Sequence, residues 1–313
     1  MACYLVTGAA GFIGSALADK LIKMGNRVVT IDNLSTGKVE NIPQKCEFIE
    51  GDTSDSRIID KLYHGKYNFD AIFHIAGQSS GEVSFENPAY YLSTNTMSTL
   101  FLLDFAKKCN IKNFIYASSM SIYGEHKEEL VNEESEKIPK SFYAVGKYAS
   151  ENYMRIYSAF GIQCTALRFF NVYGIGQNLD NLKQGMASIY LAMALNDNHI
   201  VVKGSKDRFR DFVYIDDVIE ACLKTLLLNK SELFNYYNIS NKRKIKVEYI
   251  IELIQKQLPK TTVEYVEGTP GDQFGIYGEN MKAIKELNWE PVVNFESGMK
   301  KFIDYAIKLK RGN

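Results

Sequence analysis

A tyrosine and a lysine four residues apart are the side chains most suggestive of chemistry in this sequence. They are Tyr143 and Lys147, in a segment that we predict to be a helix running to about Phe160. Side chains at this spacing share one face of a helix. An ammonium group near a phenol favours the tyrosinate form and lowers the phenol pKa from its usual value of about 10. The pair suggests a tyrosine that acts as a general base, although ordinary surface pairs share this spacing.

A serine cluster precedes this pair in the chain. Ser118, Ser119 and Ser121 directly follow a predicted buried strand over residues 113–117. Open parallel sheets place reactive groups at the carboxyl ends of their strands. We therefore expect the serines and the tyrosine–lysine pair to meet at one edge of a sheet. Gly146 lies inside the predicted helix, where glycine costs roughly 1 kcal/mol relative to alanine, so we expect another backbone or a ligand to approach it closely.

The N-terminal stretch from Tyr4 to Asp32 indicates what lies beside these residues. An apolar strand is followed by glycines at three-residue intervals, Gly8, Gly11 and Gly14, then by a helical pattern and a second strand. Glycine at these positions permits a tight turn, close approach of a phosphate and close packing of the helix on the sheet. The helix N-terminus presents unpaired N–H groups and partial positive charge to a pyrophosphate. The arrangement predicts a dinucleotide site.

Asp32 indicates which dinucleotide is bound. It follows Gly14 at about the twenty-residue spacing of a carboxylate that reaches the adenosine ribose. A carboxylate there accepts hydrogen bonds from a free 2′-hydroxyl and repels a 2′-phosphate, which favours NAD over NADP. The polar loop that follows is able to close over the adenosine and contains Asn33, Ser35, Thr36 and Gly37.

The end of a third predicted strand, residues 46–50, adds Asp52 and Thr53. A carboxylate just past a strand end lies on the ligand-bearing edge of a parallel sheet. The alternative is that Asp52 caps a helix that begins near Asp55. Both roles are compatible with the sequence.

The fourth predicted strand, residues 70–75, leads into small residues that let backbone pass beside a cofactor. His74 lies inside this apolar strand, so we expect a packed, hydrogen-bonded core residue rather than a base or a metal ligand. A long helix is predicted from Pro88 to about Lys108. Asn95 is a polar group among its apolar neighbours and therefore needs a partner.

The composition argues against several other classes of protein. The 313 residues include 37 acidic and 37 basic side chains, so bulk charge predicts neither a nucleic-acid partner nor binding to an anionic membrane. No stretch matches the roughly eighteen apolar residues of a membrane span, and the first strand begins too early to leave room for a signal peptide. The five cysteines are scattered without metal-ligand spacing, so we expect no metal and a reduced, cytoplasmic protein.

The order of the elements predicts an α/β fold of the Rossmann type, with a doubly wound parallel sheet. Further strands are expected at 163–167 and 237–240, and a helix at 218–228. The pattern then loosens after residue 170 into loops containing Gly, Asn and Gln. We expect an NAD-binding domain and a smaller, interleaved α/β substrate lobe, with the domain formed by 1–170 and the returning segment 212–240 and the lobe formed by 171–211 and 241–313.

Several segments together resemble a known family. The matching segments are TGAAGFIG, HIAG, YAVGK, RFFNVYG, RDFVYIDDV and PGD. They are similar to motifs of the extended short-chain dehydrogenases/reductases, and specifically of the NAD-dependent sugar-nucleotide epimerases and dehydratases. The resemblance covers nearly the whole chain, and the segment HIAGQSSGEVSFENP particularly resembles UDP-glucose (UDP-galactose) 4-epimerases.

The resemblance implies NAD as the cofactor, with Asn95 contacting the cofactor loop and Lys147 holding the nicotinamide ribose. It also implies a homodimer that pairs through helices 88–108 and 142–160. The residues implied for the cofactor are Gly8, Gly11, Phe12, Ile13, Gly14, Asp32, Asn33, Ser35, Thr36, Gly37, Asp52, Thr53, Ile75, Ala76, Gly77, Gln78, Asn95, Ser118, Tyr143, Lys147 and Phe170.

The resemblance further implies oxidation and re-reduction at one sugar carbon, catalysed by Ser119, Tyr143 and Lys147. Tyr143 removes the proton from the sugar 4-hydroxyl while the C4 hydride passes to NAD and returns to the other face. Ser119 bonds the same oxygen and relays the proton. The residues implied for the nucleotide-sugar substrate are Ser79, Ser119, Ser121, Tyr143, Asn171, Arg210 and Asp272.

Two departures from the family pattern bear on the reaction and the substrate. Dehydratases carry an Asp-Glu pair where this chain has Met120 and Ser121, so elimination is disfavoured. Thr269 stands where many relatives have a diphosphate-binding arginine, which leaves that task to Arg210 unless Arg210 forms a surface salt bridge instead. The expected activity is C4 epimerisation of UDP-glucose and UDP-galactose. The alternatives are an N-acetylhexosamine, uronic or non-UDP sugar nucleotide as substrate, a dehydratase or reductase, or a non-catalytic NAD-binding regulator.

Overall fold

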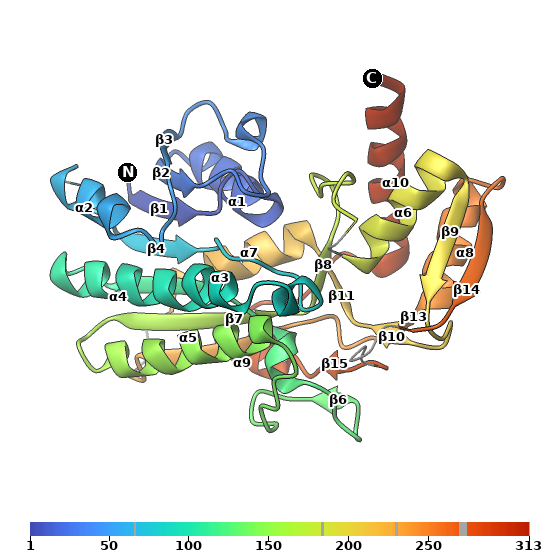
Figure 1. The fold of residues 1–313 in the computed structure, drawn as a ribbon. Helices are drawn as coiled ribbons and strands as arrows, with labels where there is room; N and C mark the ends of the chain where they lie inside the picture. The colour runs from blue at the N-terminus through green and yellow to red at the C-terminus, as the bar shows by residue number, and fades with distance from the viewer. Residues whose placement is uncertain (66, 183–184, 229–230, 269–273, 313) are drawn as a thin grey trace.

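A computed structural model describes residues 1–65, 67–182, 185–228, 231–268 and 274–312 (Figure 1). Its centre is a seven-stranded sheet in the order β12-β7-β5-β4-β1-β2-β3, and all neighbouring strands in it run parallel. The predicted Rossmann-type fold is therefore confirmed. The strands are β1 (Cys3–Thr7), β2 (Arg27–Asp32), β3 (Glu47–Glu50), β4 (Ala71–His74), β5 (Asn113–Ser119), β7 (Gln163–Phe169) and β12 (Phe234–Ile239).

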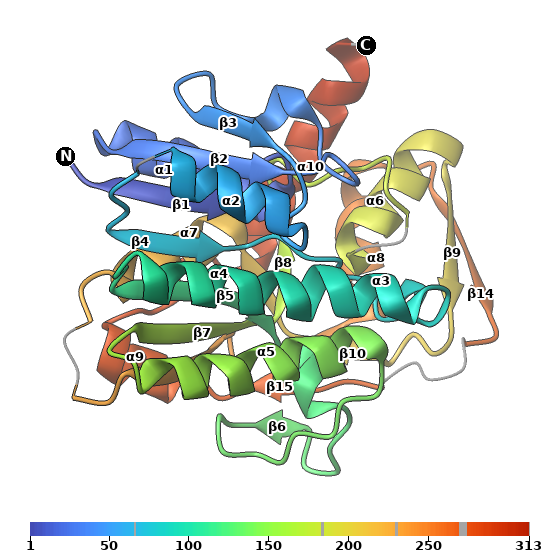
Figure 2. The same ribbon diagram turned by 60° about the vertical axis from the view of Figure 1, so that its left-hand side comes forward.

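Helices cover both faces of this sheet (Figures 1 and 2). One face carries α2 (Ser56–His64), α4 (Ser98–Lys108) and α5 (Phe142–Ser158). The other carries α1 (Phe12–Lys23), α7 (Ile215–Thr225) and α9 (Met281–Leu287). The helix predicted at 218–228 therefore begins and ends three residues earlier than expected, and it does return to the sheet, where it packs on α1.

The alternation of side chains along β5 shows why the central strands are almost wholly apolar. Phe114 and Tyr116 point into the core under α4 and α5, whereas Ile115 and Ala117 point into the core on the opposite face. Successive side chains of a strand lie on opposite faces of the sheet. A strand covered by helices on both sides must therefore be apolar at nearly every position.

The prediction of a single long helix from Pro88 to Lys108 is wrong in one detail, because a π-helical turn interrupts it. The structure has α3 (Pro88–Leu92), a π-helical turn, η3 (Ser93–Met97), and then α4. The hydroxyl of Thr94 donates to Tyr90 O (2.9 Å), and that of Thr99 donates to Asn95 O (3.0 Å). Side-chain hydrogen bonds of this kind compete with the regular helical ladder, and periodicity alone does not detect the extra residue of a π turn.

Most of the remaining elements form a lobe beside the carboxyl edge of the sheet (Figure 1). Its two-stranded sheets pair β9 with β14, β10 with β13, β8 with β11, and β6 with β15. The proposed division of the chain at residues 170, 211 and 240 stays a prediction. The elements of the lobe are β6 (Leu130–Val131), β8 (Asn171–Tyr173), α6 (Met186–Asp197), β9 (His199–Lys203), β10 (Phe209–Arg210), β11 (Phe212–Tyr214), β13 (Ile245–Lys246), α8 (Val247–Gln257), β14 (Thr262–Val266), β15 (Tyr277–Gly278) and α10 (Phe295–Gly312). Three short turns lie between elements of the sheet and its helices: η1 (Val39–Asn41) between β2 and β3, η2 (Val83–Phe85) before α3, and η4 (Met120–Tyr123) after β5.

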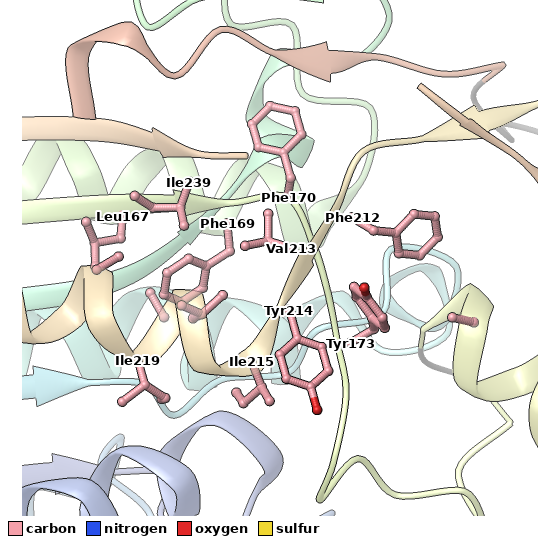
Figure 3. Close-up of a cluster of buried hydrophobic side chains, with 14 of the residues drawn as sticks. Leu167, Phe169, Phe170, Tyr173, Phe212, Val213, Tyr214, Ile215, Ile219 and Ile239 are labelled. Carbon is pink, nitrogen blue, oxygen red and sulfur yellow. The ribbon is translucent and has the colours of Figure 1, made fainter. Parts of the chain in front are cut away.

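Aromatic side chains join the sheet to this lobe (Figure 3). The ring of Tyr173 meets Phe212 and Tyr214 edge-on, at centroid distances of 5.8 and 5.4 Å. Beside this cluster, the buried carboxylate of Asp217 accepts hydrogen bonds from the backbone N–H groups of Val292 and Val293, each at 3.1 Å. The C-terminal segment is thereby fixed to the helix that returns to the sheet.

Candidate active site

A cavity of about 350 Å³ lies at the carboxyl edge of the central sheet. Tyr143, Lys147 and Ser119 line it together with the glycine turn, as the sequence predicted. The other predicted residues that line it are Gly8, Gly11, Phe12, Ile13, Gly14, Asp32, Asn33, Ser35, Thr36, Gly37, Asp52, Thr53, Ile75, Ala76, Gly77, Gln78, Ser79, Ser118, Phe170 and Asn171.

The turn between β1 and α1 has room only for glycine at two positions. Gly8 has a φ of +75°, in the left-handed region that favours glycine. A Cβ atom placed on Gly14 would lie 2.1 Å from the carbonyl oxygen of Gly8. Gly11, the residue before the first turn of α1, makes no side-chain cap, so the helix N-terminus keeps N–H groups for an anionic ligand.

Asp32 is held in place at the end of β2 by backbone donors. The N–H groups of Ala10 and Leu34 donate to its two carboxylate oxygens at 2.9 and 2.8 Å. Nearby, Asp52 accepts a 2.7 Å hydrogen bond from the Asn33 amide. The residue that caps α2 is Asp55 rather than Asp52. Asp52 instead lines the cavity.

The polar side chain of Asn95, for which the sequence predicted a partner, lies in the π turn and is hydrogen-bonded to Gln78. Asn95 accepts from the backbone N–H of Gln78 (2.8 Å) and donates to its carbonyl oxygen (2.9 Å). It therefore fixes the loop after β4 without itself lining the cavity. His74 is fully buried and hydrogen-bonded with Thr7 and Ser98, and burial followed by the charge of Lys147 lowers its pKa to about 3, as expected of a neutral core residue.

Lys147 reaches the cavity from α5. Its ammonium group donates a 2.7 Å hydrogen bond to the carbonyl oxygen of Ala117 and lies 5.9 Å from the centre of the Tyr143 ring. Burial lowers its pKa from 10.5 to about 7. The predicted close approach at Gly146 is also present, since a Cβ there would lie 3.2 Å from the Thr96 hydroxyl.

The expectation that Lys147 lowers the pKa of Tyr143 is wrong for the structure described. Burial raises the Tyr143 pKa to about 12, and the hydroxyls of Ser119 and Ser121 only partly oppose this. The reason is that one apolar environment penalises both charged forms, the phenolate and the ammonium. The Ser119 hydroxyl accepts a hydrogen bond from the backbone N–H of Ser121 (3.2 Å).

Two predicted substrate residues do not line the cavity as described. Ser121 lies in η4 and is not among the described residues that line the cavity. Arg210 is buried in the lobe, where its guanidinium donates to the carbonyl oxygens of Phe209 (2.8 Å) and Phe274 (3.1 Å), and burial lowers its pKa to about 10. Arg210 is thus not an exposed surface ion pair, and its role toward a diphosphate stays a prediction. Asp272 and Thr269 lie outside the described residues.

One wall of the cavity was not predicted from the sequence. It comes from the loop after β8 and the start of α6, where the sequence shows only that the periodic pattern loosens. The residues concerned are Gly176, Gln177, Asn178, Asn181, Gly185, Met186 and Ala187. Within the described part of the chain, no group of three or more His, Cys, Asp or Glu side chains is suited to a metal ion. None of the helices described combines the length and apolar character needed to cross a membrane.

A parallel sheet whose carboxyl edge carries a glycine turn, a carboxylate at the end of β2 and a tyrosine–lysine pair defines an enzyme class that binds a dinucleotide. Residues 4–240 match the model of the NAD dependent epimerase/dehydratase family, and the chain belongs to that family. The glycine turn and the Asp32 carboxylate at the cavity fit NAD, which is its cofactor.

Individual relatives match over nearly their whole length. A putative UDP-glucose 4-epimerase of Methanocaldococcus jannaschii is 33% identical over 96% of this chain and 97% of its own. A UDP-glucose 4-epimerase of Thermotoga maritima, solved with UDP-glucose, is 32% identical with a TM-score of 0.93 over 98% of this chain and 99% of its own. A UDP-glucuronic acid 4-epimerase of Bacillus cereus, solved with UDP-glucuronic acid and NAD, is 30% identical with a TM-score of 0.88 over the same shares.

The first prediction concerns the glycine turn. Gly14→Ala places a methyl group against the Gly8 carbonyl, so α1 must move away from β1 and NAD affinity should fall by about tenfold or more. Gly81→Ala is the control, because a Cβ there would meet only the Ser141 side chain at an ordinary 3.5 Å. Calorimetric titration with NAD measures both variants. Equal affinity in Gly14→Ala and the wild type contradicts the prediction.

The second prediction concerns the buried amine of Lys147. The unfolded chain keeps this proton up to about pH 10.5, whereas the folded protein releases it near pH 7. Between these values the unfolded state binds more protons, so the contribution of Lys147 to stability rises with pH. Relative to Lys147→Met, the wild type should gain on the order of a few kcal/mol of unfolding free energy from pH 7 to 10. Urea denaturation across this range checks it, and a difference that does not vary with pH refutes it.

Proposed function

We propose that the protein epimerises a nucleotide sugar at C4, with UDP-glucose and UDP-galactose as its substrates. The observation that carries the proposal is that Ser119, Tyr143 and Lys147 line one cavity beside the glycine turn. The names of the relatives support the same reaction, and they include epimerases of UDP-glucose and of UDP-glucuronic acid. A uronic or N-acetylated sugar is therefore the next substrate to test.

In this reaction Tyr143 takes the proton of the sugar 4-hydroxyl and later returns it. Bound NAD+ supplies the hydride acceptor and a positive charge that favours tyrosinate. Ser119, held by the Ser121 N–H, bonds the same sugar oxygen and relays the proton. Lys147 binds the nicotinamide ribose from its anchor on the Ala117 carbonyl. General base catalysis of this kind contributes about 10²–10⁴-fold to the rate, and positioning of the reactants supplies the rest.

The residues beside Ser119 favour epimerisation over elimination. A dehydratase must add and remove protons beyond C4, which needs an acid close to the sugar. The η4 turn offers Met120 and Ser121 at the corresponding positions, and neither side chain is acidic. A non-catalytic regulator is disfavoured because the complete catalytic set faces the cavity.

We also propose that two copies of the chain pair through α3, α4 and α5. These helices lie side by side (Figures 1 and 2), and they expose apolar side chains to solvent. Leu92 is 58% exposed, Val145 is 51% exposed and Ile156 is 61% exposed. Large exposed apolar patches mark interaction sites, and these three side chains are large, apolar and carried by one helical layer. A second copy is the occupant we favour because the same helices from both copies would bury this surface as a four-helix contact.

We propose the cytoplasm as the place of action. All five cysteines are free thiols, and two of them, Cys164 and Cys222, are buried in the core. Free cysteines throughout are usual in a reducing compartment.

The third prediction tests the catalytic assignment. Tyr143→Phe should lower kcat with UDP-galactose by about 10²-fold or more, because it removes the base, while NAD affinity stays near that of the wild type. Ser119→Ala should lose less, because the tyrosine keeps its own contact with the sugar oxygen. Steady-state rates measured beside NAD titrations check both variants. Full activity in Tyr143→Phe overturns the proposed mechanism.

The fourth prediction tests the dimer. Val145→Glu combined with Ile156→Glu places charges in the apolar surface and should convert the dimer to a monomer. Leu227→Glu is the matched control, because Leu227 is 82% exposed but lies beyond α7, away from these helices. Sedimentation measures the mass of each variant. A wild type that sediments as a monomer at micromolar concentration contradicts the proposal.

A further inference from the structure

We propose that Glu151 and Arg168 are positioning residues that hold Ser119 and Lys147 in place for the reaction. The inference rests on the proposed function for the tasks of these two residues. Neither Glu151 nor Arg168 is among the described residues that line the cavity. They form a buried charged pair directly behind it, connecting α5 to the carboxyl ends of β5 and β7.

The pair has the geometry of a strong, directional contact. Nε of Arg168 donates to Oε1 of Glu151 at 3.0 Å, and Nη2 donates to Oε2 at 2.7 Å. The two side chains are 3% and 1% exposed. Bidentate pairing of guanidinium and carboxylate fixes orientation as well as distance.

Arg168 is also fixed on its remaining sides. Its Nη1 donates to the Tyr123 hydroxyl and to the Glu133 carbonyl oxygen, each at 2.9 Å. Its guanidinium carbon lies 5.3 Å from the centre of the Tyr123 ring and 4.5 Å from that of Tyr236. With these contacts the guanidinium has little freedom to change rotamer, so it provides a rigid support for Glu151.

Glu151 transmits this support to the catalytic strand. The Ser118 hydroxyl donates a 2.6 Å hydrogen bond to Oε1 of Glu151. The neighbours of Ser118 on β5 are Ala117, whose carbonyl oxygen holds the Lys147 ammonium at 2.7 Å, and the catalytic Ser119. Glu151 lies one helical turn after Lys147 on α5. Two successive hydrogen bonds, Lys147 to Ala117 and Ser118 to Glu151, therefore tie one face of α5 to the end of β5.

Stability alone is a weak explanation for this arrangement. Burying two charges costs desolvation free energy, and apolar side chains of similar volume often serve the fold equally well. Placement of catalytic groups is far more sensitive, since a displacement of about 1 Å can cost on the order of 10²-fold in rate. The pair is suited to that task because the rigidly held Glu151 fixes the position of Ser118, and with it the position of the neighbouring Ser119.

Glu151→Gln is the variant that tests the inference. Glutamine keeps the size of the side chain but turns an N–H₂ group toward Arg168, which removes one hydrogen bond and leaves the guanidinium charge unbalanced. Ser118→Ala is the second variant, because it removes the hydrogen bond that connects Glu151 to β5 and leaves the ion pair intact. Ser118 also lines the cavity, so this variant tests the inference through kcat and its pH profile, and Glu151→Gln tests it through NAD affinity as well. Asp217→Asn is the matched control, a buried carboxylate with two backbone donors and no part in the cavity.

Three measurements are made on each holoenzyme: the melting temperature, the NAD affinity, and kcat and KM across pH with the sugar that the wild type converts. Both test variants should show a kcat about tenfold lower or more, with KM within about twofold. Their NAD affinity should fall several-fold, and the kcat profile should move to higher pH because Ser119 no longer lowers the Tyr143 pKa as effectively. Asp217→Asn should lower the melting temperature alone.

The inference is overturned if Glu151→Gln and Ser118→Ala behave like Asp217→Asn, with a lower melting temperature but unchanged kcat, pH profile and NAD affinity. Should Glu151→Gln fail to fold, the kcat and pH profile of Ser118→Ala decide the matter. NAD affinity is measured without any sugar, so it tests positioning independently of turnover. A wild type that converts none of the nucleotide sugars overturns the proposed function. The NAD affinity of Glu151→Gln still tests the positioning role in that case.

Discussion

The hydrogen bond from the Lys147 ammonium to the Ala117 carbonyl oxygen is the contact on which the site depends. It joins α5 to the end of β5. Because Tyr143 is also on α5, this contact fixes the position of its side chain at the cavity. The same contact requires burial of an amine, which lowers the Lys147 pKa to about 7. The protein thereby keeps, next to its tyrosine, a lysine whose charge responds to small changes in its surroundings.

The sheet explains why the other functional groups meet at this place. Every strand in it runs parallel. The glycine turn after β1, Asp32 at the end of β2, Asp52 after β3, and Ser118 and Ser119 at the end of β5 therefore all lie at one edge. The crevice outside the carboxyl ends of such a sheet is where ligands bind. Gly14 allows α1 to lie against the turn with no side chain between them, which leaves the helix N-terminus close to a ligand at this edge.

Local chemistry was predictable from the sequence, whereas long-range placement was not. Spacing alone indicated the glycine turn and the helix face shared by Tyr143 and Lys147, because both depend on neighbours within a few residues. The π turn at Asn95 depends on hydroxyls that compete with the helix ladder, which a periodic pattern does not register. The position of Arg210 depends on Phe274, far along the chain, and the direction of the Tyr143 pKa depends on how deeply the folded protein buries the phenol. The cavity wall at Gly176, Gln177 and Asn178 belongs to the loop after β8, and loops carry little periodic signal.

The central claim is that this site inverts C4 of a nucleotide sugar with the NAD that it holds. Protein purified without added cofactor is mixed with UDP-galactose, and the anomeric proton signals are followed by NMR over time. The account predicts that UDP-glucose appears and that the mixture reaches an equilibrium with no net consumption of NAD. Unchanged UDP-galactose, in protein shown to contain NAD, would contradict the assignment of UDP-galactose as substrate. If the N-acetylated and uronic sugars were unchanged as well, the claim of C4 epimerisation would fall.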